Sequence, residues 1–461
     1  MIPVVTPAQM TAIDAAAPET VDELVARAGA AVARVAREML GGHYGRRVVV
    51  IAGPGNNGRD GEVAAELLAR RGAAVGIVAA TDPPARLAPC DLVIDAAFGT
   101  GLARPWHPPH LAPGTPVLAV DTPSGVDGLT GDAAGSPLAA DVTVTFAALK
   151  PGLLFGAGRS LSGEVRVADI GLDVGGADTH LIELADVAAG WPRRAVDTHK
   201  WRSACWVVGG SPNMTGAAYM AAAAAARSGA GYVRLSVPGL EAPGGPVEAV
   251  GHPLDEGEWA PEVLAGLDRF AALVIGPGLG SGRHDAEAVR RAVADAPVPV
   301  VVDGDGLGAL GDKALTVLAG RSAATVLTPH DAEFARLTGH APGDDRIAAA
   351  RRLASETGAH VLLKGPTTVV AAPGGAVRLS VAGDSRLATA GTGDVLSGMI
   401  GGLLAAGADA LTAASLAAVV HGHAATMGPS SGLIASDLPG LVALVLDELV
   451  PAPRGVHVER I

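Results

Sequence analysis

A glycine-rich turn with a single acid, Gly391-Thr392-Gly393-Asp394, is the part of this sequence best suited to catalysis. An apolar stretch of small residues follows, so we expect a helix that begins at the turn. Glycines let the backbone come close to a ligand, and the first free amides of a helix bind anions such as phosphate. An aspartate beside a bound phosphate can act as the base that activates a substrate hydroxyl. The plain alternative is a helix with an aspartate in its first turn.

Three glycine-rich loops follow expected strands in the first half, at residues 53–61, 95–102 and 121–128. Each loop carries an acid, and the first also presents Asn56 and Asn57, whose oxygens can coordinate a hard cation or bond to a sugar or carboxamide. The loop at 53–61 formally matches the G-x-G-x-x-G pattern of dinucleotide-binding sites. This match is weak evidence for such a site, because Asp60 would repel a pyrophosphate. Ligands bind at the carboxyl edge of open α/β sheets, so three such loops favour a site over a helix-capping turn.

Four stretches of the second half also lie where strands are expected to end, at residues 209–218, 276–280, 328–333 and 364–368. Each alone could be a turn, but their occurrence together with the Asp394 turn favours one ligand site. His330 by itself is typical of a helix start. Because the other stretches occur in the same half of the chain, we favour a contact between His330 and the substrate. Lys364 is one of only four lysines, and a compact ammonium is not equivalent to a guanidinium at a phosphate.

Short Val-rich strands that alternate with helical stretches must position these loops, which predicts an α/β protein with parallel sheets covered by helices. In the first half we expect strands at 47–52, 74–79, 91–96, 116–120 and 141–146. In the second half we expect them at 204–208, 232–237, 272–275, 298–302, 324–327 and 360–363, followed by a hairpin of 367–372 and 376–381. A polar, Pro-containing segment at 190–201 predicts two domains, 1–190 and 191–461.

Composition limits the classes of function. The length of 461 residues allows two or three domains, and a net charge of −13 without blocks of like charge argues against nucleic-acid or anionic-membrane binding. Cys90 and Cys205 are too far apart in sequence for a disulfide framework or a zinc site. The apolar region from Met399 to Met427 is broken at Gly407-Ala408-Asp409, so we expect two packed helices there. We predict a soluble, cytoplasmic protein without a signal peptide, and a homo-oligomer.

The three loops of the first half, in this order, resemble the epimerase domain of the NAD(P)H-hydrate repair enzymes, with Arg59 where that family usually has Gly. The resemblance implies a Rossmann-like three-layer α/β/α domain that epimerises hydrated nicotinamide nucleotides. It implies proton transfer by Asp121 and a potassium ion held by Asn57, Asp95 and Ser124. The implied substrate-binding residues are Asn56, Asn57, Gly58, Arg59, Asp60, Gly99, Thr100, Gly101, Leu102, Ala103, Arg104, Pro105 and Asp121. Lys150 could reach this site or merely end a strand.

The second half is similar to the ADP-dependent NAD(P)H-hydrate dehydratase domain, which is ribokinase-like. The resemblance implies that ADP, with Mg²⁺, phosphorylates the C6 hydroxyl of the S hydrate, and that loss of phosphate restores NAD(P)H and leaves AMP. It implies a catalytic Asp394. The implied substrate contacts are Ala217, Gly278, His330 and Asp394, and the implied nucleotide contacts are Lys364, Gly365, Pro366, Thr367, Thr368 and Gly393.

Two other functions remain open at this point. A ribokinase-like kinase of a vitamin-precursor alcohol, fused to a noncatalytic ligand-binding domain, would share the Asp394 turn but would not need the three loops of the first half. A nucleotide-sensing or scaffolding protein would have two degenerate sites, against which the retention of Asn57, Asp121, Lys364 and Asp394 argues.

Overall fold

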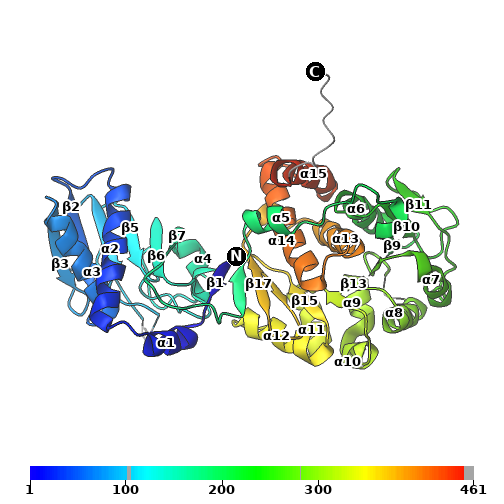
Figure 1. Ribbon diagram of the computed structural model, residues 1–461, viewed down its shortest axis with the longest axis horizontal. Coiled ribbons are helices and arrows are strands. Elements are labelled where there is room, and N and C mark those ends of the chain that lie inside the picture. Colours follow the sequence, from blue (N-terminus) through cyan, green and yellow to red (C-terminus); the bar gives the residue numbers. More distant parts are fainter. Residues whose placement is uncertain (101–104, 281, 451–461) are drawn as a thin grey trace, which may run out of the picture. The chain divides into compact units, whose positions relative to one another are not determined.

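The structure is a computed structural model that describes residues 1–100, 105–280 and 282–450. The chain forms two compact units, one of residues 2–179 and one that begins at residue 180 and includes Met1 (Figure 1). The units therefore change over ahead of the expected boundary near residue 190. The reason is that helix α5 (Leu184–Gly190) belongs to the second unit, where Val187 and Trp191 are part of the hydrophobic core.

The first unit contains a wholly parallel sheet in the order β3-β2-β4-β5-β6-β7. Its strands are β2 (Arg47–Ala52), β3 (Ala74–Ala79), β4 (Leu92–Ala96), β5 (Val117–Val120), β6 (Val142–Phe146) and β7 (Glu164–Ala168), and β1 (Ile2–Val4) lies near the N-terminus. The five strands expected in this half are confirmed to within one residue at either end. Strand β7 was not expected from the sequence.

The helices of the first unit are α1 (Pro7–Ala16), α2 (Val21–Met39), α3 (Asn56–Ala69) and α4 (Gly158–Leu161). Helices α2 and α3 cover one face of the sheet, and their buried residues are mostly alanine and valine. The other face is covered largely by loop segments around Leu87 and Trp106 rather than by long helices. Because β2 lies between β3 and β4, the loops after β2 and β4 lead away in opposite directions and leave a crevice at the carboxyl edge.

The sheet of the second unit runs β8-β17-β16-β15-β14-β13-β12-β9-β10-β11, parallel from β15 to β11 and antiparallel at the β15–β16 and β16–β17 pairs. Its strands are β8 (Thr179–Leu181), β9 (Ala204–Val208), β10 (Tyr232–Ser236), β11 (Ala249–Gly251), β12 (Ala272–Ile275), β13 (Val300–Val302), β14 (Thr325–Leu327), β15 (His360–Leu363), β16 (Thr368–Ala371) and β17 (Val377–Ser380). The expected strands and the hairpin of β16 and β17 are confirmed to within two residues at either end, whereas β8 and β11 were not expected from the sequence.

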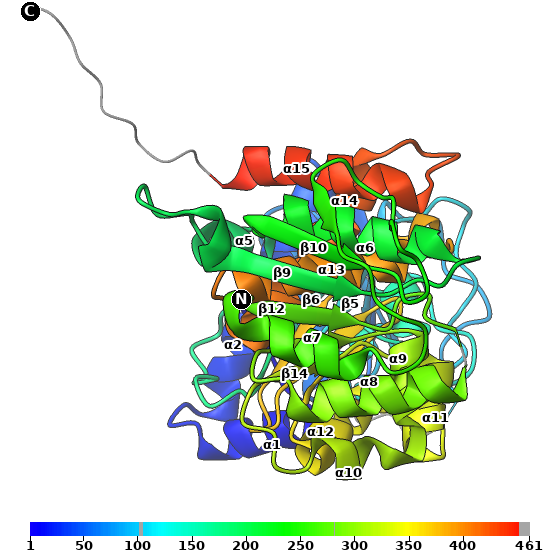
Figure 2. The ribbon, with the colours of Figure 1, turned by 90° about the vertical axis from the view of Figure 1, so that its right-hand side faces the viewer.

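Helices cover both faces of this sheet. Figure 2 shows α6 and α13 on one side of β9, β10 and β12, and α7 and α8 on the other. The helices are α6 (Thr215–Arg227), α7 (Ala260–Gly266), α8 (Arg283–Asp295), α9 (Asp305–Leu310), α10 (Ala314–Leu318), α11 (Asp331–Thr338), α12 (Arg346–Thr357), α13 (Thr392–Ala405), α14 (Ala410–Met427) and α15 (Leu438–Leu449).

The apolar region from Met399 to Met427 is two helices, as expected: α13 ends at Ala405 and α14 begins at Ala410. The Asp409 carboxylate accepts a hydrogen bond from the backbone amide of Thr412 and so caps α14. None of the helices among the described residues is both long and apolar enough to cross a bilayer.

Close packing of α13 on α6 positions the glycine-rich turn. The turn requires Gly391, whose φ of +95° is a left-handed value. Further along α13, a Cβ on Gly398 would overlap the carbonyl oxygen of Ala221 in α6. A Cβ on Gly402 would lie 2.6 Å from the carbonyl oxygen of Ala225. The small residues that made this stretch look apolar therefore let two helix backbones come close together.

We expect Gly398→Ala to destabilise the second unit by about 1–3 kcal/mol, because the added methyl overpacks the α6–α13 contact. Gly440→Ala is the matched control, since Gly440 also lies in a helix but has open space around its Cβ position. That control should be neutral or stabilising by up to about 1 kcal/mol. Urea unfolding of both variants measures the difference, and equal midpoints would contradict the packing argument.

Candidate active sites

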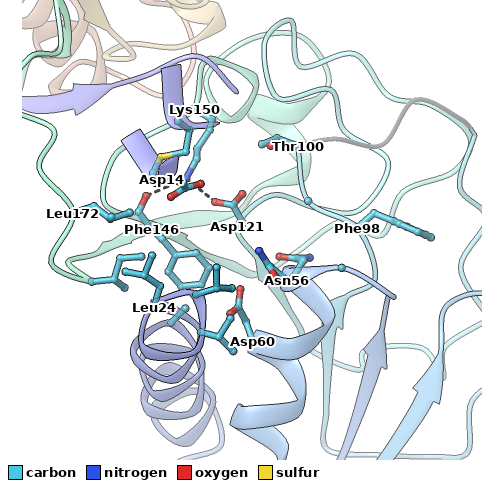
Figure 3. A pocket seen from close by; sticks show the side chains of 18 of the residues that line it. Asp14, Leu24, Asn56, Asp60, Phe98, Thr100, Asp121, Phe146, Lys150 and Leu172 are labelled. Carbon is cyan, nitrogen blue, oxygen red and sulfur yellow. Dashed lines mark hydrogen bonds and ion pairs between the residues drawn. The ribbon is translucent and has the colours of Figure 1, made fainter. Parts of the chain in front are cut away.

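A cavity of about 670 Å³ lies at the carboxyl edge of the first sheet (Figure 3). The loops after β2, β4 and β5 meet there. A Cβ on Gly99 would lie 3.7 Å from Cγ of Asn57 and 3.7 Å from Oδ2 of Asp121. One residue from each of the other two loops therefore lies within contact distance of the Cβ position of Gly99. Side chains of α1 and α2, among them Asp14 and Leu24, close the cavity on the other side.

An ion pair forms the polar centre of this cavity. Nζ of Lys150 lies 2.7 Å from Oδ1 of Asp121, and it also donates to Oγ1 of Thr145 and to the carbonyl oxygen of Phe146. Lys150 is 2% exposed and Asp121 is 17% exposed, so the carboxylate is the member of the pair that a ligand can reach. Asp121 has a φ of +64°, a strained value for a non-glycine residue and one that clusters at functional sites.

Two further carboxyl groups line the same cavity. Burial raises the pKa of Asp60 to about 8, and the nearby Asp121 adds to this shift while Arg59 opposes it. Burial also raises the pKa of Asp14, an effect that the Lys150 ammonium partly offsets. The cavity therefore holds a carboxyl group that keeps its proton at neutral pH near a carboxylate in an ion pair, which is an arrangement suited to acid–base chemistry.

The three expected potassium ligands lie close to this cavity. Asp95 is fully buried, and its oxygens accept hydrogen bonds from the hydroxyl and amide of Ser124 at 2.6 and 3.0 Å. Burial raises the pKa of Asp95, and within the described ranges no lysine or arginine pairs with it. Nδ2 of Asn57 is buried and has no hydrogen-bond partner among the residues that the structure describes. The Arg59 guanidinium pairs instead with Asp22 of α2.

The other expected contacts of the first unit divide into three groups. Asn56, Asn57, Asp60, Gly99 and Thr100 line the cavity. Gly58 packs against the backbone of Gly53, and Arg59 lies outside the lining. Gly101, Leu102, Ala103 and Arg104 lie outside the described residues, and Pro105, which follows them, is exposed.

The second site lies where α13 begins. The Asp394 carboxylate makes no hydrogen bond within the described part of the chain, so it does not serve as a helix cap. Nearby, Nζ of Lys364 lies 2.9 Å from Oδ1 of Asp303 and 3.6 Å from Oε2 of Glu333. A Cβ on Gly393 would lie 3.3 Å from the same Nζ. The lysine at the end of β15 therefore reaches the glycine-rich turn.

Burial raises the pKa of Asp394 to about 7, with further contributions from the negative charges of Asp303, Asp305 and Glu333. Lys364 opposes the shift without cancelling it. A carboxyl group with a pKa near the working pH is suited to accept a proton in catalysis. Its surroundings also carry an excess of negative charge that a cation would relieve.

The remaining expected contacts of the second unit lie along the same sheet edge. The loops after β9 and β12 are joined by a hydrogen bond from the amide of Gly210 to the carbonyl of Pro277. A Cβ on Gly278 would lie 2.9 Å from that of Ala217, so these two residues are neighbours. Gly365, Pro366, Thr367 and Thr368 connect β15 to β16.

His330 has a structural role at the start of α11. Its Nδ1 accepts a hydrogen bond from the amide of Ala332, and its own amide donates to Glu333. The imidazole is 52% exposed, so the rest of the ring remains accessible to a ligand.

Four residues of the two sites were not assigned a role from the sequence: Asp14, Thr145, Asp303 and Glu333. Asp303 follows a buried Val-rich strand, a signal that could have placed it at the sheet edge. Glu333 lies in the stretch 328–333 that the sequence singles out, whereas Asp14 and Thr145 reach the first site from helix and strand positions that lack a local motif. The sequence left open whether Lys150 reaches the first site or merely ends a strand, and the structure has it beside Asp121.

Two family profiles match the chain. That of NAD(P)H-hydrate dehydratase matches residues 205–441, and that described as YjeF-related protein N-terminus matches residues 21–88 and 78–152. The bifunctional NAD(P)H-hydrate repair enzyme of Mycobacterium tuberculosis is 42% identical over 377 residues, which cover 75% of this chain and 76% of the relative. The Escherichia coli enzyme of the same name is 33% identical, with 79% and 77% covered.

The chain belongs to this family. It is a bifunctional enzyme of NAD(P)H-hydrate repair that combines an epimerase with a dehydratase. The kinase and scaffold alternatives are thereby set aside, since the repair enzymes match both units and not the second alone.

Solved structures agree with the fold of the second unit. An ADP/ATP-dependent NAD(P)H-hydrate dehydratase of Bacillus subtilis, co-crystallised with ATP and Mg²⁺, is 29% identical with a TM-score of 0.52 and covers 58% of this chain and 97% of that structure. A ribokinase-like superfamily protein of Enterococcus faecalis, 19% identical with a TM-score of 0.52, covers 60% of this chain and 98% of its own and supports the ribokinase-like fold alone.

Proposed function

We propose that the cavity of the first unit interconverts the R and S hydrates of NAD(P)H, and that the Asp394 site of the second unit dehydrates the S form at the expense of ADP. The observation that supports this most strongly is the pair of half-buried carboxyl groups, Asp121 and Asp394, each at a sheet edge where glycine-rich loops meet. A repair enzyme of this kind needs at least one proton-transfer group in each unit.

The first reaction takes place at C6 of the hydrated ring, which bears a hydroxyl group and is bonded to the ring nitrogen. A protonated acid assists departure of the hydroxyl as water, the nitrogen lone pair forms an iminium ion, and water returns to the opposite face as a base takes its proton. Asp60, which holds its proton below about pH 8, supplies the acid, and the Asp121 carboxylate supplies the base. Lys150 positions Asp121 from behind.

The rate of epimerisation should fall as the pH rises through about 8, because the raised pKa keeps Asp60 protonated only below that value. Asp60→Asn cannot donate a proton, so it should lower the rate at pH 7 and remove the alkaline limb of the profile. Initial rates with pure R hydrate at several pH values provide the measurement. An alkaline limb that persists in Asp60→Asn would assign the acid to another group.

A potassium ion held by Asn57, Asp95 and Ser124 would balance the buried charge of Asp95, which has no cationic side chain beside it in the described residues. These ligands offer oxygens and one formal charge, which suits a large monovalent cation better than Zn²⁺. The ion would keep Asp95 ionised and fix the loops after β4 and β5, on which Gly99 and Asp121 lie.

At constant ionic strength, we expect potassium to raise the epimerase rate about tenfold or more over tetramethylammonium, since loss of an outer group at a metal site costs about 10–100-fold. Ser124→Ala should weaken this activation. Crystals soaked with thallium, which replaces potassium and scatters strongly, should show density among the three side chains at distances longer than the ~2.1 Å of Mg²⁺–oxygen bonds. Water or the Arg59 guanidinium at this position, together with indifference to the cation, would contradict the assignment.

In the second unit, Asp394 would accept the proton of the C6 hydroxyl while the hydroxyl oxygen attacks the terminal phosphorus of ADP. AMP departs in this step. The C6–O bond then breaks, phosphate leaves, and loss of a proton from C5 restores the dihydropyridine ring. Free amides at the start of α13 and the nearby Lys364 ammonium would contact the transferred phosphate. Lys364 to Thr368 would hold the nucleotide, and Ala217, Gly278 and His330 the hydrate.

Magnesium would arrive with the nucleotide and spread the charge of its phosphates. The excess negative charge around Asp394 fits such a cation, while the described residues contain no cluster of three or more acids, histidines or cysteines that could hold a metal by themselves. We also expect a homo-oligomer in the cytoplasm, which light scattering and cell fractionation would test.

Supplying each purified hydrate with ADP and Mg²⁺ tests the proposal. The S hydrate should be converted directly to NAD(P)H, and the R hydrate only after epimerisation. A protein that converts the S form and leaves the R form untouched, except at its spontaneous rate, would show that the first unit is not an epimerase.

A further inference from the structure

A second cavity of about 510 Å³ lies in the first unit between α2 and α3. Its lining is basic, with one acid, Asp169, among alanine and leucine side chains. The basic residues are Arg27, Arg34, Arg37, His43 and Arg71, and we call this cavity the arginine hollow.

Only some of these charges are compensated. The Arg27 guanidinium lies 3.1 Å from Oε1 of Glu19 and donates to the carbonyl of Ile170 at 2.7 Å. Across the described ranges, Arg34, Arg37 and Arg71 have neither an acidic partner nor a side-chain hydrogen bond. Nδ1 of His43 is buried and lacks a hydrogen-bond partner as well. Arg34 and Arg71 are exposed and Arg37 is half-buried, so their guanidinium donors are open to a ligand in the hollow.

Helix stability explains only part of this arrangement. Arg37 lies in the last turn of α2, where a cation interacts favourably with the helix dipole. That argument does not extend to Arg34, and Arg71 comes from the segment after α3. The spacing of Arg27, Arg34 and Arg37 places all three on one face of α2, the face that borders the hollow. Four arginines converge here against one acid, Asp169, in a protein with a net charge of −13, so the hollow carries a local excess of positive charge that a bound anion would offset.

We propose that the arginine hollow binds a phosphate-bearing small molecule of nucleotide size. Guanidinium groups bind phosphate oxygens in a bidentate manner and remain charged at all physiological pH values. The volume lies within the range of small-molecule sites, about 300–1,000 Å³. Leu67 and Leu68 provide an apolar wall for the non-phosphate part of the ligand. This site is separate from the cavity that contains Asp121 and takes no part in epimerisation.

Arginine modification by phenylglyoxal, resolved residue by residue by peptide mass spectrometry, tests this proposal on the full-length protein. Inorganic pyrophosphate and ADP are the probes, and sodium chloride of equal ionic strength is the reference. At ten times the Kd of a probe, modification of Arg34, Arg37 and Arg71 should slow about tenfold, because about one site in eleven is then free. Arg46 and Arg86, which lie in the same unit outside the hollow, should react at unchanged rates.

Matched variants give an independent measurement. Arg34→Ser/Arg37→Ser should lose one equivalent of bound pyrophosphate in equilibrium dialysis, and Arg46→Ser/Arg86→Ser should lose none. Both should retain epimerase activity, which shows that they fold. Protection by both probes would assign the site to phosphate groups, and protection by ADP alone would narrow it to nucleotides.

Unchanged modification rates with either probe would overturn the proposal. The proposal would also be overturned if the arginines of the hollow reacted only after the protein was diluted. That result would mean that a second copy of the chain covers the hollow at the higher protein concentration.

Discussion

Asp394→Asn should abolish the nucleotide-dependent recovery of NAD(P)H from the S hydrate, with a loss of about 10²–10⁴-fold in kcat, the usual contribution of a general base. Asparagine keeps the size of the side chain but cannot accept a proton. Epimerisation should be unaffected, because Asp121 lies in the other compact unit. Asp409→Asn is the matched control, since Asp409 lies in the same unit and caps α14, a role that asparagine fills equally well.

The pH profile provides a second test of the same residue. A base with a pKa of about 7 is ionised only above that value, so kcat/KM should rise about tenfold per pH unit below 7 and level off above it. The raised pKa also means that ionisation of Asp394 destabilises the folded protein as the pH rises from 3.8 toward 7. Asp394→Asn removes this cost, so the variant should be at least as stable as the parent at pH 7. A variant that is inactive because it is unfolded would contradict this explanation.

Asp121→Asn should have the largest effect on the first unit. With the R hydrate as substrate, the initial rate of epimerisation should fall about 10²–10⁴-fold, while dehydration of the S hydrate continues. The strained backbone of Asp121 and its half-buried carboxylate, held by buried Lys150, are features of a reacting group rather than of a loop organiser.

The control for this variant distinguishes a catalytic role of the Asp121 carboxylate from a role in holding the loop in place. Thr145→Val removes one hydrogen bond to Oδ1 of Asp121 and leaves the ion pair with Lys150 in place, so it should cost far less activity. Circular dichroism should confirm that Asp121→Asn remains folded despite the unpaired lysine. An R-to-S rate equal to that of the parent would show that Asp121 only organises its loop.

Strand positions could be predicted from the sequence because parallel strands are buried on both faces and appear as short Val-rich runs. Strands β2, β3, β9, β12 and β15 have the expected bounds. The edge strand β7 was missed, since its half-exposed residues Glu164 and Arg166 interrupt any such run. The compact units change over at residue 180, ahead of the expected boundary near residue 190. Tertiary packing joins the short helix α5 to the second unit, whereas the polar segment after Trp191 is the more conspicuous feature of the sequence.

Site residues that lie in glycine-rich loops could be predicted, because the loop composition itself signals a ligand. Lys150 and Asp14 could not be assigned in this way. Lys150 lies beyond the end of β6 and Asp14 lies on α1, and only the folded chain brings them to Asp121. The acidic surroundings of Lys364 were also hidden, because Asp303 and Glu333 come from separate stretches of the sequence.

The most direct test of the account is a single assay with the purified protein, the R hydrate of NADH, ADP, Mg²⁺ and potassium, in which the absorbance of reduced nicotinamide is followed over time. The parent should restore the absorbance completely. Alone, Asp121→Asn should restore it only at the rate of spontaneous epimerisation, and Asp394→Asn should not restore it. An equimolar mixture of the two should recover the activity of the parent, because each supplies the site that the other lacks. A mixture that remains inactive, although both variants are folded, would contradict the assignment of two independent active sites.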